Sequence, residues 1–242
     1  MSQYELFPAE PPPEKVLSVW ELTAQIKSYT QSIRNANDGM SVLQTSEASL
    51  NETANILTRL RELAMESASD GIGASERGYI QTEASQLLSE VDRIAQTTKF
   101  NGTTLLSGVL TTLSFHVGVN DTTNDVINFN NIDATTSSLG VNTIDLSTLQ
   151  SSSSALTTID NALLKISTAR ATIGAVGNRF QSTINDIQAF SEALSSANSR
   201  IMDVDVAEET SAMARANILQ QAGVSVLAQA NQQPQLALKL LQ

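Results

Sequence analysis

The residues that most often carry catalytic or metal chemistry are scarce in this sequence. Its 242 residues contain one histidine, His116, and no cysteine. A histidine-based triad, a histidine-rich metal site, a disulfide and a thiolate zinc site are therefore excluded. The motifs HExxH and GxSxG and a phosphate-binding glycine loop are also missing. The sequence predicts that the protein is not an enzyme and has no catalytic residue, metal ligand or cofactor.

One dense acidic cluster is the remaining candidate for a cation site. Residues 202–209, MDVDVAEE, hold four carboxylates but lack the glycine and the ligand spacing of a calcium loop. We interpret Asp205 instead as the cap of a following helix, with Glu208 and Glu209 in its first turn, where carboxylates are favoured by the helix dipole. His116 lies on the polar phase of an alternating segment, and we interpret it as a solvated strand residue.

The charge and composition exclude further classes of function. The formal net charge is −11, from 25 acidic and 14 basic side chains, so the basic surface that nucleic acid requires is not expected. No apolar run reaches the roughly 18 residues of a membrane span, so we expect no membrane insertion. The first residues lack the basic and apolar regions of a cleaved signal peptide, and we expect export, if any, to proceed without one.

Apolar side chains that recur every three or four residues predict long helices in the first half of the chain. One stripe covers residues 22–64, and much of it keeps a seven-residue spacing, which is typical of a coiled-coil-like face. It ends near the glycines of residues 69–73. A second stripe, residues 80–94, predicts another helix that ends before the tight-turn pair Asn101-Gly102.

The centre of the chain changes to a spacing of two, which is typical of strands. Residues 113–119 alternate apolar and polar side chains, and residues 126–129 offer a second strand, so a small β-hairpin unit is predicted. Residues 130–154 are rich in Asn, Thr and Ser, and we expect a surface loop there.

Helical spacing returns in the second half of the chain. An apolar stripe over residues 173–204 predicts one long, narrow, coiled-coil-like helix. Residues 216–238 then contain no charged side chain, which is unusual for a solvated helix in so acidic a chain. The segment either folds back as a buried terminal helix or stays disordered until it assembles, and Gly223 and Pro234 favour the second alternative because they weaken an isolated helix.

Several segments resemble bacterial flagellins. They are SIRNANDGMSVLQTSEASLNETANILTRLRELAMESASDG, EVDRIAQTTKFNGTTLLSG, ALLKISTARATIGAVGNRF and SRIMDVDVAEETSAMARANILQQAGVSVLAQANQQPQLALKLL. The resemblance implies an inner coiled-coil layer, D0, and a surrounding layer of helices and β-hairpins, D1. The expected fold class is mainly α: a long coiled-coil-like helical rod with a small β-hairpin unit and a C-terminal D0-type helix.

The resemblance also implies a division of the chain into five parts. Residues 1–21 form an atypical Pro-rich tail, and residues 22–100 form the N-terminal helical part of D1. Residues 101–155 form the hairpin and Ser/Thr-rich loop unit. Residues 156–204 form the C-terminal long helix of D1, and residues 205–242 form the D0-type helix.

Residues 1–21 do not match the family, so the resemblance implies a flagellin that lacks the usual N-terminal D0 helix and the variable outer domains. We therefore expect the chain alone to stay monomeric or to aggregate, and to join filaments when an intact subunit supplies the lattice. A hook–filament junction protein and an engineered, truncated flagellin serving as an immune agonist are the alternatives.

The function implied by the resemblance is a structural, self-assembling subunit of the extracellular flagellar filament, and hence a role in motility. The implied partners are other flagellin subunits, the export chaperone FliS and the innate immune receptor TLR5. Carried over by position, Arg59, Leu63 and Glu83 are the receptor contacts, although Arg59 and Glu83 could equally be ordinary solvated charges. The residues expected to serve self-assembly and chaperone binding are Ile218, Leu219, Val226, Leu227, Leu236, Leu240 and Leu241.

Overall fold

The computed structural model describes residues 13–108, 112–202 and 206–240, with side chains at 19–108, 112–202 and 210–230. Within these ranges the chain is predominantly helical, with two small antiparallel sheets, which confirms the predicted fold class. Glu21–Leu194 forms one compact unit, and the helix α5 (Val206–Leu240) belongs to a second.

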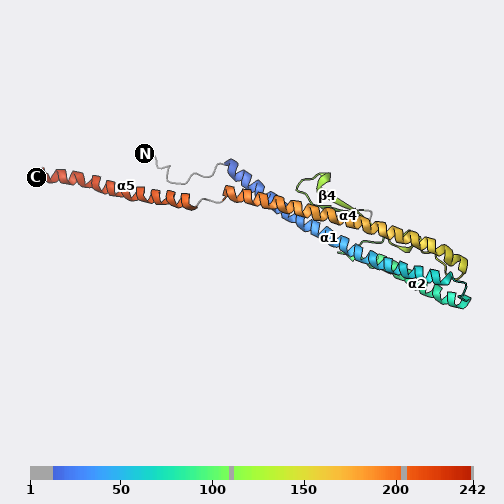
Figure 1. Cartoon of the computed structure of the whole chain (residues 1–242). Coiled ribbons are helices and arrows are strands. Elements are labelled where there is room, and N and C mark those ends of the chain that lie inside the picture. The colour runs from blue at the N-terminus through green and yellow to red at the C-terminus, as the bar shows by residue number, and fades with distance from the viewer. Residues whose placement is uncertain (1–12, 109–111, 203–205, 241–242) are drawn as a thin grey trace. The chain divides into compact units, whose positions relative to one another are not determined.

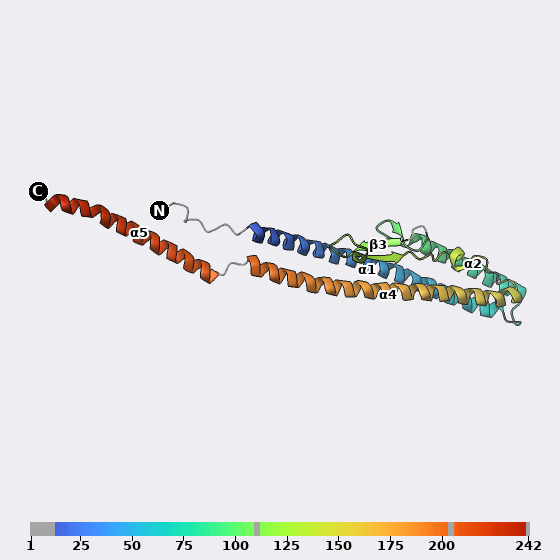
Figure 2. The ribbon, with the colours of Figure 1, turned by 90° about the horizontal axis from the view of Figure 1, so that it is seen from above.

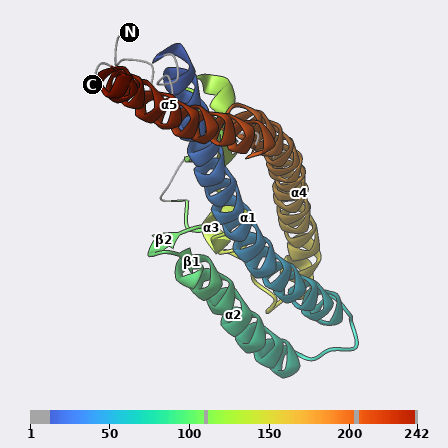
Figure 3. The ribbon, with the colours of Figure 1, turned by 90° about the vertical axis from the view of Figure 1, so that its left-hand side faces the viewer.

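In the described part of the Glu21–Leu194 unit, three long helices run beside one another (Figures 1 and 2). They are α1 (Pro13–Ser67), α2 (Ala74–Thr97) and α4 (Leu149–Met202). Figure 3 shows α1 between the other two. Arg59 of α1 reaches Glu83 of α2, whereas Arg61 of α1 reaches Asp160 of α4. Two sides of the same helical turn therefore contact different helices, so α1 must bury a wide face.

Two parallel seams of α1 are buried at seven-residue intervals. The first is the apolar seam that the sequence predicts, and none of its members is more than 2% exposed: Ala36, Leu43, Leu50, Leu57 and Ala64. The second, which we call the small-residue seam, is also buried and is interrupted only by Leu60: Ser32, Gly39, Ser46, Thr53 and Ser67. Small side chains at this seam allow neighbouring elements to approach the backbone of α1 closely.

The hydroxyl groups of the small-residue seam all find hydrogen-bond acceptors, as burial requires. Ser46 and Thr53 donate to the carbonyl oxygens four residues earlier in α1, each at 3.0 Å. Ser32 donates to the carbonyl of Gly118 at 2.9 Å, and Ser67 donates to the carbonyl of Leu146 at 2.6 Å. The two ends of the seam thus tie α1 to segments that are distant in the sequence.

The first hairpin pairs β1 (Lys99–Phe100) with β2 (Thr103–Thr104). Its turn residues Asn101 and Gly102 both have positive φ, 47° and 82°. This is the type I′ geometry that the Asn-Gly pair favours, and the turn predicted there is confirmed.

The second hairpin pairs β3 (Thr112–His116) with β4 (Val126–Asn130), after the short helix η1 (Thr123–Asp125), and confirms both predicted strands. Asn35 of α1 donates to the carbonyl of His116 at 2.9 Å, beside the Ser32 contact. Phe115 of β3 meets Phe180 of α4 edge to face, with ring centroids 5.6 Å apart. The hairpin therefore packs against α1 and α4 together.

The prediction of a surface loop at residues 130–154 is wrong. This segment contains α3 (Thr136–Leu139) and buries several apolar side chains, and α4 already begins at Leu149. Asp92 of α2 accepts hydrogen bonds from the backbone and hydroxyl of Thr136, both at 2.8 Å, and Lys165 of α4 donates to the carbonyl of Ser138 at 2.8 Å. Polar composition misled the sequence argument because Thr and Ser here serve as capping and anchoring groups.

Other bounds differ from the expectations as well. α1 begins at Pro13, inside the Pro-rich tail expected at residues 1–21, and proline is tolerated in the first helical turn. The apolar stripe of α4 is buried as far as Ile187, but Phe190 is 60% and Ile201 is 44% exposed. The predicted cap Asp205 and its neighbours at 203–209 lie outside the residues whose side chains are described.

Gly39 and Gly78 allow a matched test of the small-residue seam. A Cβ at Gly39 would lie 2.6 Å from Cζ of Phe180, whereas nothing lies within 4 Å of a Cβ at Gly78. We expect Gly39→Ala to lower the free energy of unfolding by about 1–3 kcal/mol through overpacking. Gly78→Ala should raise it by about 0.5–1 kcal/mol, because alanine favours a helix interior. Urea unfolding followed by circular dichroism measures both, and equal effects would contradict close packing at Gly39.

α5 generates a second prediction. All of its described side chains, residues 210–230, are exposed, and a helix without tertiary packing is only marginally stable. We expect the amides of α5 to exchange rapidly with solvent in a dilute monomer, beside slow exchange in α1 and α4. Hydrogen exchange with mass spectrometry measures the difference, and strong protection throughout α5 would refute it.

Candidate functional site

Arg59 and Glu83, two of the predicted receptor contacts, lie together where α1 meets α2. Nε of Arg59 donates to Oε1 of Glu83 at 3.0 Å, and Nη1 donates to Glu62 at 3.0 Å. The hydrogen bond to Glu62, and to a smaller extent the one to Glu83, raises the pKa of Arg59 above its ordinary value, so the side chain stays positively charged. Both side chains of the Arg59–Glu83 pair are about half exposed, 50% and 47%. Solvent screening makes such a pair a small contributor to stability, and its groups are accessible to a partner.

Leu63, the third predicted contact, is only 1% exposed. It shares one line along α1 with the buried residues Val42 and Ile56, fourteen residues and then seven residues apart, with the half-buried Ser49 between the first two. α1 is the middle helix and buries a wider face than a single apolar stripe would require. At this burial the Leu63 side chain offers almost no surface for a direct receptor contact in the monomer.

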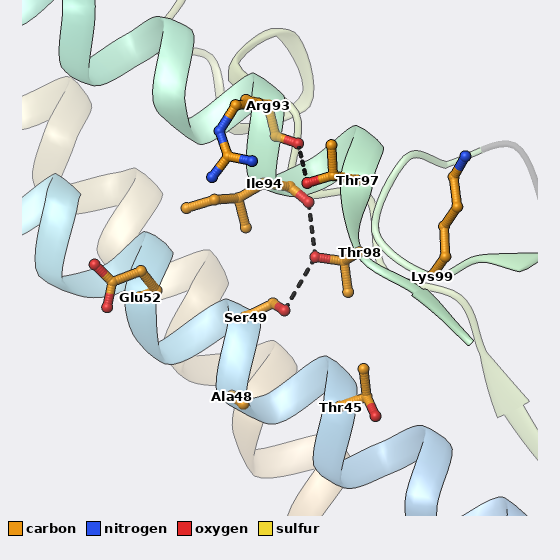
Figure 4. Close-up of a pocket in the computed structure, with 9 residues that line it drawn as sticks. All are labelled: Thr45, Ala48, Ser49, Glu52, Arg93, Ile94, Thr97, Thr98 and Lys99. Carbon is orange, nitrogen blue, oxygen red and sulfur yellow. Dashed lines mark hydrogen bonds between the residues drawn. The ribbon is translucent and has the colours of Figure 1, made fainter. Parts of the chain in front are cut away.

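A shallow groove of about 480 Å³ follows the same α1–α2 junction (Figure 4). Thr45, Ser49 and Glu52 line it from α1, and Arg93 lines it from α2. The hydroxyl of Thr98 donates to the Ile94 carbonyl at 2.7 Å and lies 3.0 Å from the Ser49 hydroxyl, from which it can accept, so it closes the helix end and does not face a ligand. Glu52 is the one carboxylate among the nine described lining residues. The groove offers polar contacts but no nucleophile with a base beside it.

The other chemical candidates give no site. The side chain of His116 is exposed on β3, as predicted. Among the described side chains, no group of three or more His, Asp or Glu could hold a metal ion. No helix within the described ranges is long and apolar enough to cross a membrane.

Six of the seven residues predicted for self-assembly lie on α5, and the structure describes the side chains of four of them. Ile218, Leu219, Val226 and Leu227 are 64–71% exposed. Leu236 and Leu240 belong to the part whose side chains are not described, and Leu241 lies outside the described residues. These four apolar side chains are therefore exposed to solvent.

The sequence analysis missed Arg77 and Phe190. Arg77 of α2 donates to the carbonyls of Ser67 and Ser69, both at 2.8 Å, and so caps the end of α1. A basic residue shortly after a helix end was the signal for this role. Phe190 stacks on Tyr29 with ring centroids 6.3 Å apart, at the exposed end of a stripe that the sequence suggested was buried.

Comparison with known proteins gives matches over most of the chain. Residues 17–111 match the model of the bacterial flagellin N-terminal helical region, and residues 156–241 match that of the C-terminal helical region. The flagellin of Halalkalibacterium halodurans is 38% identical, covering 91% of this chain and 81% of that protein. The flagellin of Bacillus subtilis is 36% identical, over 91% of this chain and 83% of that protein.

Solved structures of flagellar proteins also match this chain. The crystal structure of Bacillus cereus flagellin matches with a TM-score of 0.57 and 33% identity, over 64% of this chain and 88% of that chain. A putative flagellar hook-associated protein from Vibrio parahaemolyticus matches with a TM-score of 0.66, over 78% of this chain and 97% of that chain. Its sequence is only 12% identical, so this match shows a similar fold and nothing more. The two family models and the flagellin relatives together show that this chain belongs to the bacterial flagellin family.

Proposed function

We propose that the chain is a structural subunit of the flagellar filament and that it polymerises through the exposed apolar face of α5. Flagellins are structural filament proteins, so family membership confirms that the chain is not an enzyme. It also implies self-assembly into a polymer of flagellin subunits outside the cell. We propose in addition a role in motility. The observation that carries the α5 proposal is an uncharged run whose described side chains, residues 216–230, are all exposed.

The apolar face of α5 has the spacing of a coiled-coil seam. Apolar or small residues recur in steps of four and three: Ala212, Ala216, Leu219, Gly223, Val226 and Ala230. Every one of them is exposed. Fully burying an aliphatic side chain stabilises an assembly by roughly 1.5–3 kcal/mol, so a few such side chains per subunit supply a substantial association energy.

We propose in addition that the export chaperone FliS covers this segment before assembly. Leu219 and Val226 are seven residues apart on one face of the helix, and Ile218 and Leu227 lie next to them, which suits an amphipathic helix bound in a groove. A chaperone on these side chains would also prevent premature polymerisation. Leu236, Leu240 and Leu241 extend the same proposed surface.

Charge placed on the α5 face tests assembly. We expect Val226→Asp to raise the critical concentration for elongating filament seeds of a related flagellin by about tenfold or more, because an unpaired carboxylate is costly in an apolar interface. Gln221→Asp, on another side of α5, should elongate seeds like the parent chain. Light scattering and electron microscopy give the result, and calorimetry with FliS should show weaker binding for Val226→Asp only. Normal elongation by Val226→Asp would contradict the assigned face.

We propose also that Arg59 and Glu83 are contacted by TLR5, as the resemblance to flagellins implies. The physical support is that the two side chains lie on neighbouring helices and are each about half exposed. Each of them could therefore give up its present ion pair and bind a charged group of a partner. Arginine is enriched among the residues that dominate binding energy at interfaces. Leu63, the third residue implied by the resemblance, is buried four residues after Arg59 on the same helix.

The Arg61–Asp160 pair provides the control for the receptor proposal, since it also bridges two helices and is about half exposed. We expect Arg59→Ala with Glu83→Ala to raise the concentration for half-maximal TLR5 signalling by about tenfold or more. Arg61→Ala with Asp160→Ala should leave it near the parent value, with similar unfolding temperatures for both double variants. A reporter-cell assay decides, and full signalling by the first variant would exclude these contacts.

A further inference from the structure

A recess of about 280 Å³ lies within the Glu21–Leu194 unit, between α1, α4 and the turn that joins β3 to β4. Tyr29 of α1 lines it and stacks on Phe190 of α4, with ring centroids 6.3 Å apart and 12° between the ring planes. We call it the Tyr29–Phe190 recess. Four lining residues follow one another along α4 in steps of four, three and four, and therefore share one face of that helix: Arg179, Thr183, Asp186 and Phe190.

This face of α4 separates two opposite charges. At a rise of 1.5 Å per residue, Asp186 lies about 6 Å from Phe190 along the helix axis, and Arg179 lies about 10.5 Å farther on. One end of the face therefore carries a carboxylate beside the aromatic rings, and the other end carries a guanidinium. Both charged side chains are exposed, and neither forms an ion pair or hydrogen bond with another side chain in the described part of the chain.

A second carboxylate, that of Asp125, lines the recess from the β3–β4 turn. Its Oδ2 accepts hydrogen bonds from the backbone N–H and the hydroxyl of Thr122, whereas its Oδ1 accepts none from the described residues. Gly118 makes room for this carboxylate, because a Cβ at Gly118 would overlap it. Ser32 of α1 donates to the carbonyl of Gly118 at 2.9 Å and so fixes this wall of the recess without any ligand.

Aromatic faces together with carboxylates are suited to organic cations. A guanidinium group stacks on an aromatic ring by cation–π attraction and donates hydrogen bonds to a carboxylate in its own plane. The charged lining residues are Asp125, Asp186 and Arg179, so the recess as a whole is acidic. Arg179 lies at the far end of the face and is suited to a carboxylate of the same ligand. A molecule with a guanidinium at one end and a carboxylate at the other meets both requirements.

We propose that the Tyr29–Phe190 recess binds arginine, either as the free amino acid or as the C-terminal residue of a peptide. The guanidinium of the ligand lies against the two rings and Asp186, and its carboxylate lies at Arg179. The volume is just below that of pockets for drug-sized ligands, which suits a molecule as small as an amino acid. The recess uses no residue of α5, so its binding is measured on the monomer and does not depend on filament formation.

Three small molecules test the assigned orientation by titration of the full chain, followed by the chemical shifts of the protein in NMR spectra. L-Arginine should bind. L-Citrulline, in which an uncharged urea group replaces the guanidinium, should have a dissociation constant at least about tenfold higher. L-Argininamide, which lacks the carboxylate, should bind severalfold more weakly than L-arginine. Equal binding of L-arginine and L-citrulline would overturn the proposal.

Substitutions test the residues. Asp186→Asn should raise the dissociation constant for L-arginine by about tenfold and Phe190→Leu should raise it severalfold, because each removes part of the cation site. Arg179→Gln should abolish the preference for L-arginine over L-argininamide, which a loss of structure alone would not do. Glu192→Gln, at an exposed carboxylate of α4 outside the recess, and Tyr79→Leu, at an exposed ring of α2, are controls that should bind like the parent chain.

Circular dichroism shows that each variant is folded, and unchanged binding by a folded Asp186→Asn variant would contradict the assigned site. The tripeptide Gly-Gly-Arg distinguishes the two sources of the ligand. Binding as tight as that of L-arginine identifies the C-terminal residue of a peptide, and binding at least about tenfold weaker identifies the free amino acid. If neither probe shifts the protein signals at millimolar concentration, the recess is not an arginine site, and the filament function is unaffected by that result.

Discussion

Close packing against the small-residue seam of α1 is the constraint on which the rest of the Glu21–Leu194 unit depends. At Gly39 the absent side chain leaves room for Phe180 of α4 and for Phe115 of β3 above the same helical turn. Larger residues would separate the helices, because interaxial distance follows the side chains at the contact. The positions of α4 and the hairpin are therefore determined together and not one after the other.

The ends of the seam extend this constraint beyond the helices. Ser32 holds the chain after β3, and Ser67 holds the segment before α4, each through a carbonyl oxygen. Ser152 adds a hydrogen bond to Ser67 at 3.0 Å. α1 is thus a continuous support to which both the hairpin and the α3 segment are attached, and the exposed Arg59–Glu83 pair keeps its geometry because the core beneath it is fixed.

The sequence predicted what depends on repeated apolar residues and on turn chemistry. The long helices, the β3–β4 hairpin and the Asn101-Gly102 turn follow from such patterns. The small-residue seam could not be found in this way, because Ser46 and Thr53 have the polarity of surface residues and are buried through hydrogen bonds to their own helix. The same reason explains the error at residues 130–154. The burial of Leu63 required knowledge that α1 has neighbours on two sides.

The polar groups buried in the described part of the chain have one further property. They are all serine or threonine, namely Ser32, Ser46, Thr53, Ser67, Thr98, Thr136 and Ser152. None of these hydroxyls gains or loses a proton in ordinary water, and all but one of them bond to uncharged groups. The exception is Thr136, which donates to the carboxylate of Asp92. The interior of the Glu21–Leu194 unit therefore depends little on acidity or ionic strength, apart from the Asp92 carboxylate that holds the α3 segment. Outside the cell, where neither is regulated, most of these buried hydrogen bonds keep the same charge state when the surroundings change.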